Sequence, residues 1–384
     1  MSAVIIDACR TAIGRAHPER GAFRDVRSDD LAVQVIKTLV ARTGVDPAAI
    51  EDVILGCTQQ QGEQGLNVGR LVAIMAGLPF TTAGASVNRL CGSSLQALNQ
   101  AAHAIAAGAE DVQIVGGLEH MQHFPMDAGI DINPALFHRT SKAALMMGVT
   151  AEFLAQTNGI SRADQDAFAL ASHQNAVAAY DAGRFTAEIV PVWGRDEAGA
   201  RTLIERDQCV RADTSLEALG ALKPAFMPKI GTVTAGNSSP LNDGAAALLI
   251  MSEQRARDLG LRPMARVLST AVAGVEPCVM GTGPVPATRK ALKRAGLKLS
   301  DIELVELNEA FAAQALACVR ALDLKPERVN VNGGSIAIGH PLGASGARIA
   351  TTLLHAMVDR DASLGLATMC IGAGQGVATV FERV

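Results

Sequence analysis

The sequence contains very few aromatic residues, which make up 3% of its 384 residues and include one Trp and one Tyr. Its core must therefore be built from Ala, Val, Ile, Leu and Met, and 37 glycines allow backbones to pack closely. No uninterrupted apolar run approaches the roughly 18 residues of a membrane-spanning helix, so no transmembrane segment is predicted. A formal net charge of −4 gives no electrostatic reason to expect a nucleic-acid partner.

Paired cysteines are also missing. The seven cysteines are odd in number, widely scattered and never arranged as C-x-x-C, which excludes a disulfide framework and a zinc ribbon. Strand-like sequence begins at Ala3 with no secretory signal pattern before it, and the C-terminus is not a peroxisomal tripeptide. We therefore expect a globular protein of two to three domains in a reducing cytoplasm.

The chain repeats itself over a long distance. The segments "GVDPAAIEDVIL" and "GLKLSDIELVEL" begin at Gly44 and Gly296, a shift of 296 − 44 = 252. The same shift relates three further pairs, namely Leu90 and Leu342, Ser93 and Ser345, and His103 and His355. Both copies read as strand followed by helix, so we interpret the chain as two copies of one fold.

The repeat also locates an insertion. The last strands of the two halves, "GAAALLIMS" from Gly244 and "GVATVFERV" from Gly376, are only 132 positions apart, so the first half holds about 120 extra residues. We predict an N-terminal half (1–120 and 240–262), an inserted loop domain (121–239) and a C-terminal half (263–384). Alternating strands and helices predict an α/β fold in which two sheets share one layer of helices.

Chemistry is expected where strands end. In "VNRLCGSSLQAL", Cys91 lies at a strand-to-helix turn, where the helix dipole can lower a thiol pKa from about 8.5 to roughly 3.5–7.5. The repeat places His340 at the image of Asn88, so both halves bring a reactive group to nearly the same turn. Cys370 and Asn308 follow further predicted strands, and these ends are the expected place for a site.

Other interpretations of these residues are less reactive. A cysteine is more often a small buried residue, and we expect this of Cys9, Cys57, Cys209, Cys278 and Cys318. "GHPLGASG" lacks the Gly-Lys-Ser/Thr ending of a phosphate-binding loop, and "GAGQG" lacks G-x-G-x-x-G spacing. The histidines of "EHMQH" (residues 119–123) form a lone H-x-x-H with too few further ligands to predict a metal site.

Four segments together resemble the thiolase family, in the family's order along the chain. They are "NRLCGSSLQAL", "NEAFAAQ", "GGSIAIGHPLGASGAR" and "CIGAGQG". The resemblance implies two βαβαβαββ halves in five layers (α-β-α-β-α) with an inserted loop domain. "GGLEHMQHFPM" resembles the degradative branch that cleaves 3-ketoacyl-CoA in bacterial fatty-acid oxidation.

The resemblance also implies roles for individual residues. Cys91 is similar to the nucleophile, His340 to the residue that activates it, and Cys370 to the acid/base cysteine. Further matches are Asn308 and Gly372 in the oxyanion holes, and Met147, Ser239 and Met280 at the substrate. Met146 stands where short-chain biosynthetic thiolases have a histidine, which argues against a substrate restricted to acetoacetyl-CoA.

Thiolysis needs no metal or redox cofactor, and CoA is a co-substrate. The resemblance implies a homodimer that docks onto a hydratase/3-hydroxyacyl-CoA dehydrogenase subunit in a heterotetramer. Two competing functions remain at this point. A ketoacyl synthase shares the fold but uses a second histidine where this chain has Cys370, and a non-catalytic lipid-binding or scaffold subunit would have lost the reactive residues that are present here.

Overall fold

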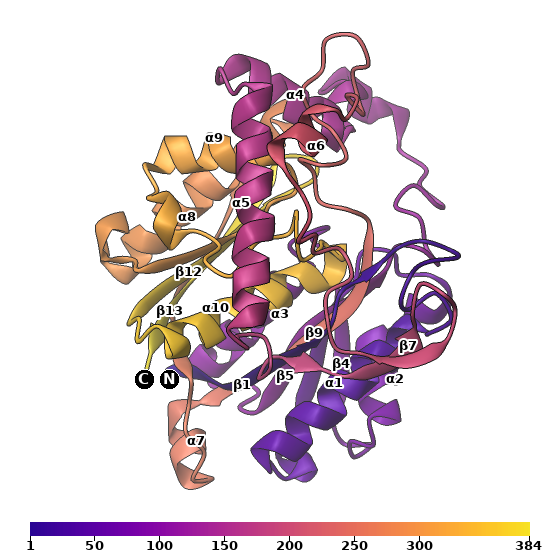
Figure 1. Ribbon diagram of the computed structural model, residues 1–384. Coiled ribbons are helices and arrows are strands. Elements are labelled where there is room, and N and C mark those ends of the chain that lie inside the picture. The colour runs from indigo at the N-terminus through magenta and orange to yellow at the C-terminus, as the bar shows by residue number, and fades with distance from the viewer.

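A computed structural model describes residues 1–384, and Figure 1 shows how its elements are arranged. The strands are β1 (Ala3–Thr11), β2 (Gly14–Arg15), β3 (Asp52–Gly56), β4 (Ala83–Val87), β5 (Gln113–His120), β6 (Ile189–Val190), β7 (Val192–Arg195), β8 (Arg201–Ile204), β9 (Asn242–Ser252), β10 (Ala265–Gly274), β11 (Leu304–Leu307), β12 (Leu364–Ile371) and β13 (Gln375–Arg383). The helices are α1 (Ser28–Thr43), α2 (Val68–Met75), α3 (Ser93–Ala107), α4 (Met147–Thr157), α5 (Arg162–Asp181), α6 (Leu216–Gly220), α7 (Glu253–Asp258), α8 (Pro284–Ala295), α9 (Ala312–Leu322) and α10 (Ser345–Asp359).

The two halves form similar sheets that join at one edge. The first has the order β4-β3-β5-β9-β1 and the second the order β11-β12-β13-β10. They meet where β1 pairs antiparallel with β10 through two residue pairs, Val4 with Arg266 and Ile5 with Ala265. The halves differ at the outer edge, because the strand β4 of the first half is matched in the second only by an isolated parallel bridge between Val305 and Val329.

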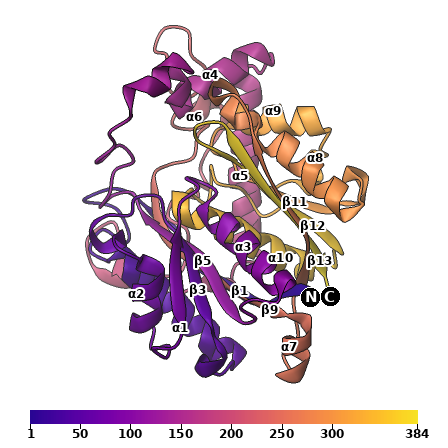
Figure 2. The ribbon, with the colours of Figure 1, turned by 180° about the vertical axis from the view of Figure 1, so that it is seen from behind.

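A layer of helices lies between the sheets. The helices α3 and α10 are each 15 residues long, begin 252 positions apart and pack against each other. Figure 2 shows them between the two sets of strands, and α10 contacts strands of both halves. With α1 and α2 outside the first sheet and α8 and α9 outside the second, the predicted five-layer α/β fold with a shared helix layer is confirmed.

The residues between β5 and β9 form α4 and α6 in the upper part of the molecule in Figure 1, a long helix across its front, and the hairpin of β7 and β8 at the lower right. That helix, α5, begins with a capping box in which Ser161 and Asp164 bond each other's backbone amides. Helix α5 then runs alongside the second half. There the hydroxyl of its Ser172 donates to the Glu309 carboxylate at 2.7 Å and accepts from the Gly334 amide at 3.0 Å. This part of the chain is thereby anchored beside the loop that carries His340.

A buried ionic cluster ties the first strand to the same region. Arg10 of β1 pairs with Glu188 at 2.6 Å and with Asp207 at 2.7 Å, and none of these side chains is exposed. Burial acts to lower the pKa of Arg10, but the two carboxylates together outweigh it and raise this pKa, so the charge of Arg10 is retained in the interior. No helix of the structure is both long and apolar enough to cross a bilayer.

Candidate active site

One cavity of about 930 Å³ lies where the two halves meet the residues between β5 and β9. Apolar side chains form most of its wall, which suits it to a ligand with a hydrocarbon part. Seven of the eight site residues predicted from the sequence line this cavity: Cys91, Met147, Ser239, Met280, His340, Cys370 and Gly372. The eighth, Asn308, lies directly behind His340, with its amide nitrogen 3.4 Å from the imidazole Nε2.

Cys91 is presented by a tight turn just before α3. Leu90 adopts a left-handed backbone conformation (φ 46°), which costs free energy for a residue with a branched side chain. The turn is stabilised by Ser93, whose hydroxyl accepts from the Arg89 amide at 2.9 Å and donates to the Leu90 carbonyl at 2.6 Å. A strained and internally bonded turn of this kind holds the sulfur of Cys91 at the cavity wall.

The expectation that the helix start lowers the pKa of Cys91 is wrong. Burial raises the pKa of the thiol to about 11, because a thiolate there would lose its hydration. The backbone amides of Gly372 and Cys91 hydrogen-bond the sulfur and act in the opposite direction, but they do not outweigh burial. Cys91 is therefore a neutral thiol at rest and needs a base when it reacts.

His340 is fixed in the form that can act as that base. Its Nδ1 lies 2.6 Å from the Ser345 hydroxyl, and this hydroxyl donates its own hydrogen to the Pro341 carbonyl at 2.7 Å. Ser345 must then accept from Nδ1–H, which leaves the lone pair on Nε2. Burial lowers the pKa of His340 to about 3, so the imidazole is neutral at rest. Its backbone amide donates to Asn242 Oδ1 at 2.8 Å.

Cys370 lies near the end of β12, beside the same sulfur. Burial raises its pKa well above the usual range of a thiol, and the proximity of Cys91 and Cys318 raises it further. Cys370 therefore carries a proton at rest. Gly372 follows in the turn to β13, where its amide is directed at Cys91.

This arrangement brings two neutral thiols, one imidazole and two convergent backbone amides to one apolar cavity. Matches to known proteins agree with it. The model of the thiolase N-terminal domain matches residues 3–254, and that of the thiolase C-terminal domain matches residues 261–383. This chain belongs to the thiolase family.

Individual thiolases are similar over the full length. A protein of Marinomonas sp. named 3-ketoacyl-CoA thiolase is 55% identical, covering 99% of this chain and 98% of its own. A protein of Aliivibrio fischeri with the same name is 56% identical and covers 99% of both. Among solved structures, the acetyl-CoA acetyltransferase of Bacillus anthracis superimposes with a TM-score of 0.91 at 40% identity, covering 100% of this chain and 99% of the other.

Three residues that support this thiolase site were not singled out from the sequence as site residues. Ser345 fixes the imidazole tautomer, Asn242 holds the His340 backbone, and Glu119 accepts from the Gly343 amide at 2.9 Å. Glu119 also accepts from Thr58 Oγ1, so one buried carboxylate links the loops of both halves. The repeat carried a signal for Ser345, because it is the image of Ser93, which supports the Cys91 turn.

The two histidines of "EHMQH" contact each other and neighbouring groups of the protein. The rings of His120 and His123 stack with their centroids 3.6 Å apart. His123 Nδ1 lies 2.9 Å from Glu63, and His120 Nε2 lies 3.1 Å from the Phe23 carbonyl. Their nitrogens are thus engaged with protein groups, and they anchor the loop that continues along the cavity.

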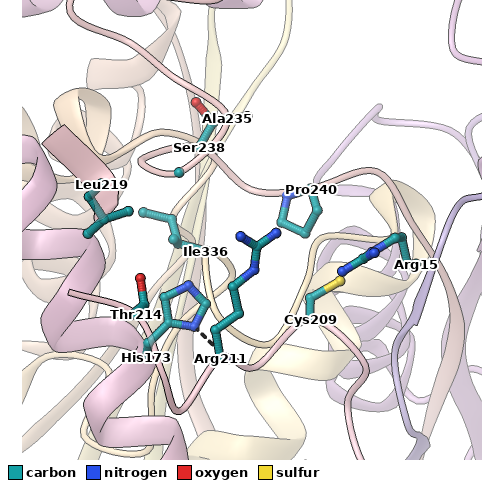
Figure 3. Close-up of a pocket in the computed structure, with 11 residues that line it drawn as sticks. Arg15, His173, Cys209, Arg211, Thr214, Leu219, Ala235, Ser238, Pro240 and Ile336 are labelled. Carbon is teal, nitrogen blue, oxygen red and sulfur yellow. Dashed lines mark hydrogen bonds between the residues drawn. The ribbon is translucent and has the colours of Figure 1, made fainter. Parts of the chain in front are cut away.

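A smaller pocket of about 40 Å³ adjoins the cavity of this thiolase and shares Ser238 and Pro240 with it. Figure 3 shows the Arg211 guanidinium directed toward Pro240, with Arg15 approaching from the other side. The Arg211 amide donates to His173 Nδ1 at 3.2 Å, which holds this segment against α5. The two arginines give this smaller pocket positive charge.

The neutral pair of Cys91 and His340 predicts a flat pH profile for acyl-enzyme formation. His340 gains a proton only near pH 3 and Cys91 loses one only near pH 11, so neither titrates between about pH 6 and about pH 9. Stopped-flow measurement of acylation by an acyl-CoA checks this. A rise with a midpoint near the ordinary thiol pKa of about 8.5 would contradict it, because the reactive species would then be a preformed thiolate.

Proposed function

We propose that this thiolase is a 3-ketoacyl-CoA thiolase of fatty-acid β-oxidation. It uses CoA to cleave 3-ketoacyl-CoA into acetyl-CoA and an acyl-CoA that is two carbons shorter. The convergence of Cys91, His340 and Cys370 on one apolar cavity carries this proposal, since the reaction needs a nucleophile, its base and a separate acid. The names of the full-length relatives support the same substrate class.

The first half of the reaction breaks a carbon–carbon bond. Cys91 gives its proton to His340 Nε2 while its sulfur attacks the C3 carbonyl carbon of the substrate. The C2–C3 bond then breaks, its electrons form the enolate of acetyl-CoA, and the acyl group remains on the sulfur. The His340 imidazolium and a water held by Asn308 donate to the enolate oxygen, and Cys370 protonates C2. Acetyl-CoA leaves, with Cys370 now a thiolate.

The second half releases the shortened chain. The Cys370 thiolate takes the thiol proton of CoA, and the CoA sulfur attacks the thioester carbonyl on Cys91. The amides of Cys91 and Gly372 stabilise the tetrahedral oxyanion, which is consistent with their position beside the Cys91 sulfur. The intermediate collapses, Cys91 departs and recovers its proton from His340, and every group returns to its starting state.

All of these steps use side chains and backbone of the protein, so we propose that no metal or redox cofactor takes part and that CoA is a co-substrate. Met147, Met280 and Ser239 are proposed to contact the substrate along the cavity wall. CoA carries several phosphates, and the charge of Arg15 and Arg211 at the adjoining pocket suits them.

A substrate chain longer than four carbons is expected to be preferred. Met146 lines the cavity while 53% exposed, and Met126 and Ile130 add flexible apolar surface, so a longer acyl chain gains contacts that acetoacetyl-CoA cannot make. We expect a higher kcat/KM for 3-ketoacyl-CoA of 8 to 16 carbons, measured by initial rates of thiolysis at saturating CoA. A higher kcat/KM for acetoacetyl-CoA would contradict this preference.

We also propose a cytoplasmic homodimer that docks onto a hydratase/3-hydroxyacyl-CoA dehydrogenase subunit. Two observations support the homodimer. The edge strand β4 has one side that pairs with no strand, and such an edge can pair with another chain. Three apolar side chains of the neighbouring α2 (Leu71, Ile74 and Met75) are 37–41% exposed. Ile74→Asp should shift the sedimentation coefficient from dimer to monomer, whereas Leu216→Asp on α6, at the other end of the molecule in Figure 1 and 53% exposed, should not. A monomeric unmodified protein, or an Ile74→Asp variant that stays dimeric, would count against this interface. Purification of the protein from its native source at low salt tests the docking, because the hydratase/3-hydroxyacyl-CoA dehydrogenase subunit should then co-purify with it.

A further inference from the structure

Arg348 on α10 places a guanidinium in the interior near the site. Its side chain is 1% exposed, and its Nη2 donates one hydrogen bond, 2.6 Å long, to the Ser335 hydroxyl. Its Nε and Nη1 have no hydrogen-bond partner, and the Glu306 carboxylate lies 3.6 Å from Nη1. A buried guanidinium with so few partners is a poor source of stability, because its desolvation is not compensated. A role other than stabilising the fold therefore has to be considered for this side chain.

The hydrogen bonds that begin at Arg348 run in one direction toward the active site. A guanidinium can only donate, so the Ser335 oxygen must accept from it. The hydrogen of that hydroxyl is then free to donate to Asn308 Oδ1, which lies 2.6 Å away. The Asn308 amide is thereby oriented with its oxygen toward Ser335 and its NH₂ group toward His340, where Nδ2 lies 3.4 Å from Nε2.

The opposite orientation of this amide would be harmful to the reaction. Ser345 fixes His340 with its lone pair on Nε2, so a reversed Asn308 would place an oxygen against that lone pair. It would also turn an acceptor, instead of a donor, toward the water that donates to the enolate oxygen. An asparagine amide has nearly the same shape in both orientations, so neighbouring donors must decide between them.

We propose that Ser335 and Arg348 are positioning residues for carbon–carbon bond cleavage, because they hold the Asn308 amide with its NH₂ group toward the reacting oxygen. This inference rests on the proposed thiolase function and adds two residues that never touch the substrate. Only the step that forms the enolate depends on Asn308. Transfer of an acyl group to Cys91 from a simple acyl-CoA uses the amides of Cys91 and Gly372 instead.

The difference between these two steps provides the test. Ser335→Ala is expected to lower kcat for thiolysis by about 10²-fold, the usual cost of losing one oxyanion donor, with KM changed less than about twofold. The rate at which Cys91 is acylated by acetyl-CoA should stay within about twofold of the unmodified enzyme. Ser335→Thr keeps the hydroxyl, so its kcat for thiolysis should be close to that of the unmodified enzyme. If Ser335→Ala does not fold, Ser335→Cys fills similar space with a weak donor and should show the same selective loss.

A matched control distinguishes positioning from packing. Thr379 of β13 donates to the buried amide oxygen of Asn99 at 2.7 Å, which is the same kind of bond away from the cavity. Thr379→Val should lower stability without lowering kcat. Equal losses of thiolysis and acylation in Ser335→Ala, or the same kcat loss in Thr379→Val, would overturn the proposal in favour of a structural role.

A double-mutant cycle tests whether Ser335 acts through Asn308. In an Asn308→Ala background, Ser335→Ala should cause no further loss of kcat, because the amide that it orients is already absent. Additive losses would overturn the proposal, as would unchanged kcat in Ser335→Ala alone. An unmodified enzyme that fails to cleave any 3-ketoacyl-CoA would instead refute the proposed function, so the two failures can be told apart.

Discussion

Cys91→Ala should abolish both acylation and turnover. Incubation of the unmodified enzyme with acetyl-CoA is expected to leave an acetyl group on the peptide that contains Cys91, and the variant should acquire none. Thiolysis should fall by at least about 10⁴-fold, because no other group in the cavity combines a nucleophilic atom with the base His340 and the two convergent amides. Peptide mass spectrometry and a thiolysis assay measure these two quantities.

The control for this variant is Cys9→Ala. Cys9 is also fully buried, but its thiol donates to the Val35 carbonyl in the outer helix α1, far from the cavity wall. The Cys9→Ala variant should still acquire the acyl label and should keep the thiolysis activity of the unmodified enzyme. An acyl group found on Cys370 of the unmodified enzyme would reverse the roles assigned to the two cysteines.

Cys370→Ala should separate the two steps that Cys91→Ala abolishes together. This variant still has Cys91, His340 and the oxyanion amides, so it should accept an acyl group from acetyl-CoA. It lacks the acid that protonates C2 and the base that takes the CoA proton, so steady-state thiolysis should fall by about 10²–10⁴-fold. Rapid-quench labelling followed by an assay with 3-ketoacyl-CoA measures each step.

The contrast between the two cysteine variants is informative because both thiols are buried and neutral. Position alone distinguishes them: the backbone amides of Cys91 and Gly372 are directed at the sulfur of Cys91. Cys318→Ala removes another buried thiol, close to Cys370, and should retain turnover, since Cys318 donates to the Gly281 carbonyl and does not line the cavity. A Cys370→Ala variant that cannot be acylated would show that Cys370 is needed for the first chemical step.

The sequence predicted the fold because the repeat could be counted along the chain. Helices α3 and α10 begin 252 positions apart, as the shift of Ser93 and Ser345 requires, and the strands around them follow. The isolated bridge that stands in place of a fifth C-terminal strand was not predictable in this way. In the segment that follows this bridge, backbone groups form hydrogen bonds with side chains instead of with a neighbouring strand. For example, the Ile336 amide donates to the Glu309 carboxylate at 3.1 Å.

The sequence predicted which residues gather at the cavity, but not their protonation. A dipole argument for Cys91 uses only its place at a helix start, whereas the pKa depends on how much water the folded chain excludes. Similarly, "GHPLGAS" indicates a reactive histidine, but the tautomer follows from a hydroxyl whose own hydrogen is bonded elsewhere. The relay from Arg348 to Asn308 joins residues 40 positions apart in sequence and leaves no periodic pattern.

The central place of β1 has a consequence for how the chain is made. Strand β1 is made well before the two long strands that flank it, in which Met251 pairs with Val4 and Ala265 pairs with Ile5. At about 5–20 residues per second, synthesis reaches these partners only after roughly 12 to 50 s. During that time a strand of nine residues, eight of them buried in the finished protein, lacks both β9 and β10 and can pair at most with the two-residue β6. Such long-range pairing also makes folding slow. Chaperone binding to nascent chains is therefore expected to concentrate on β1 and to end once β9 and β10 have emerged.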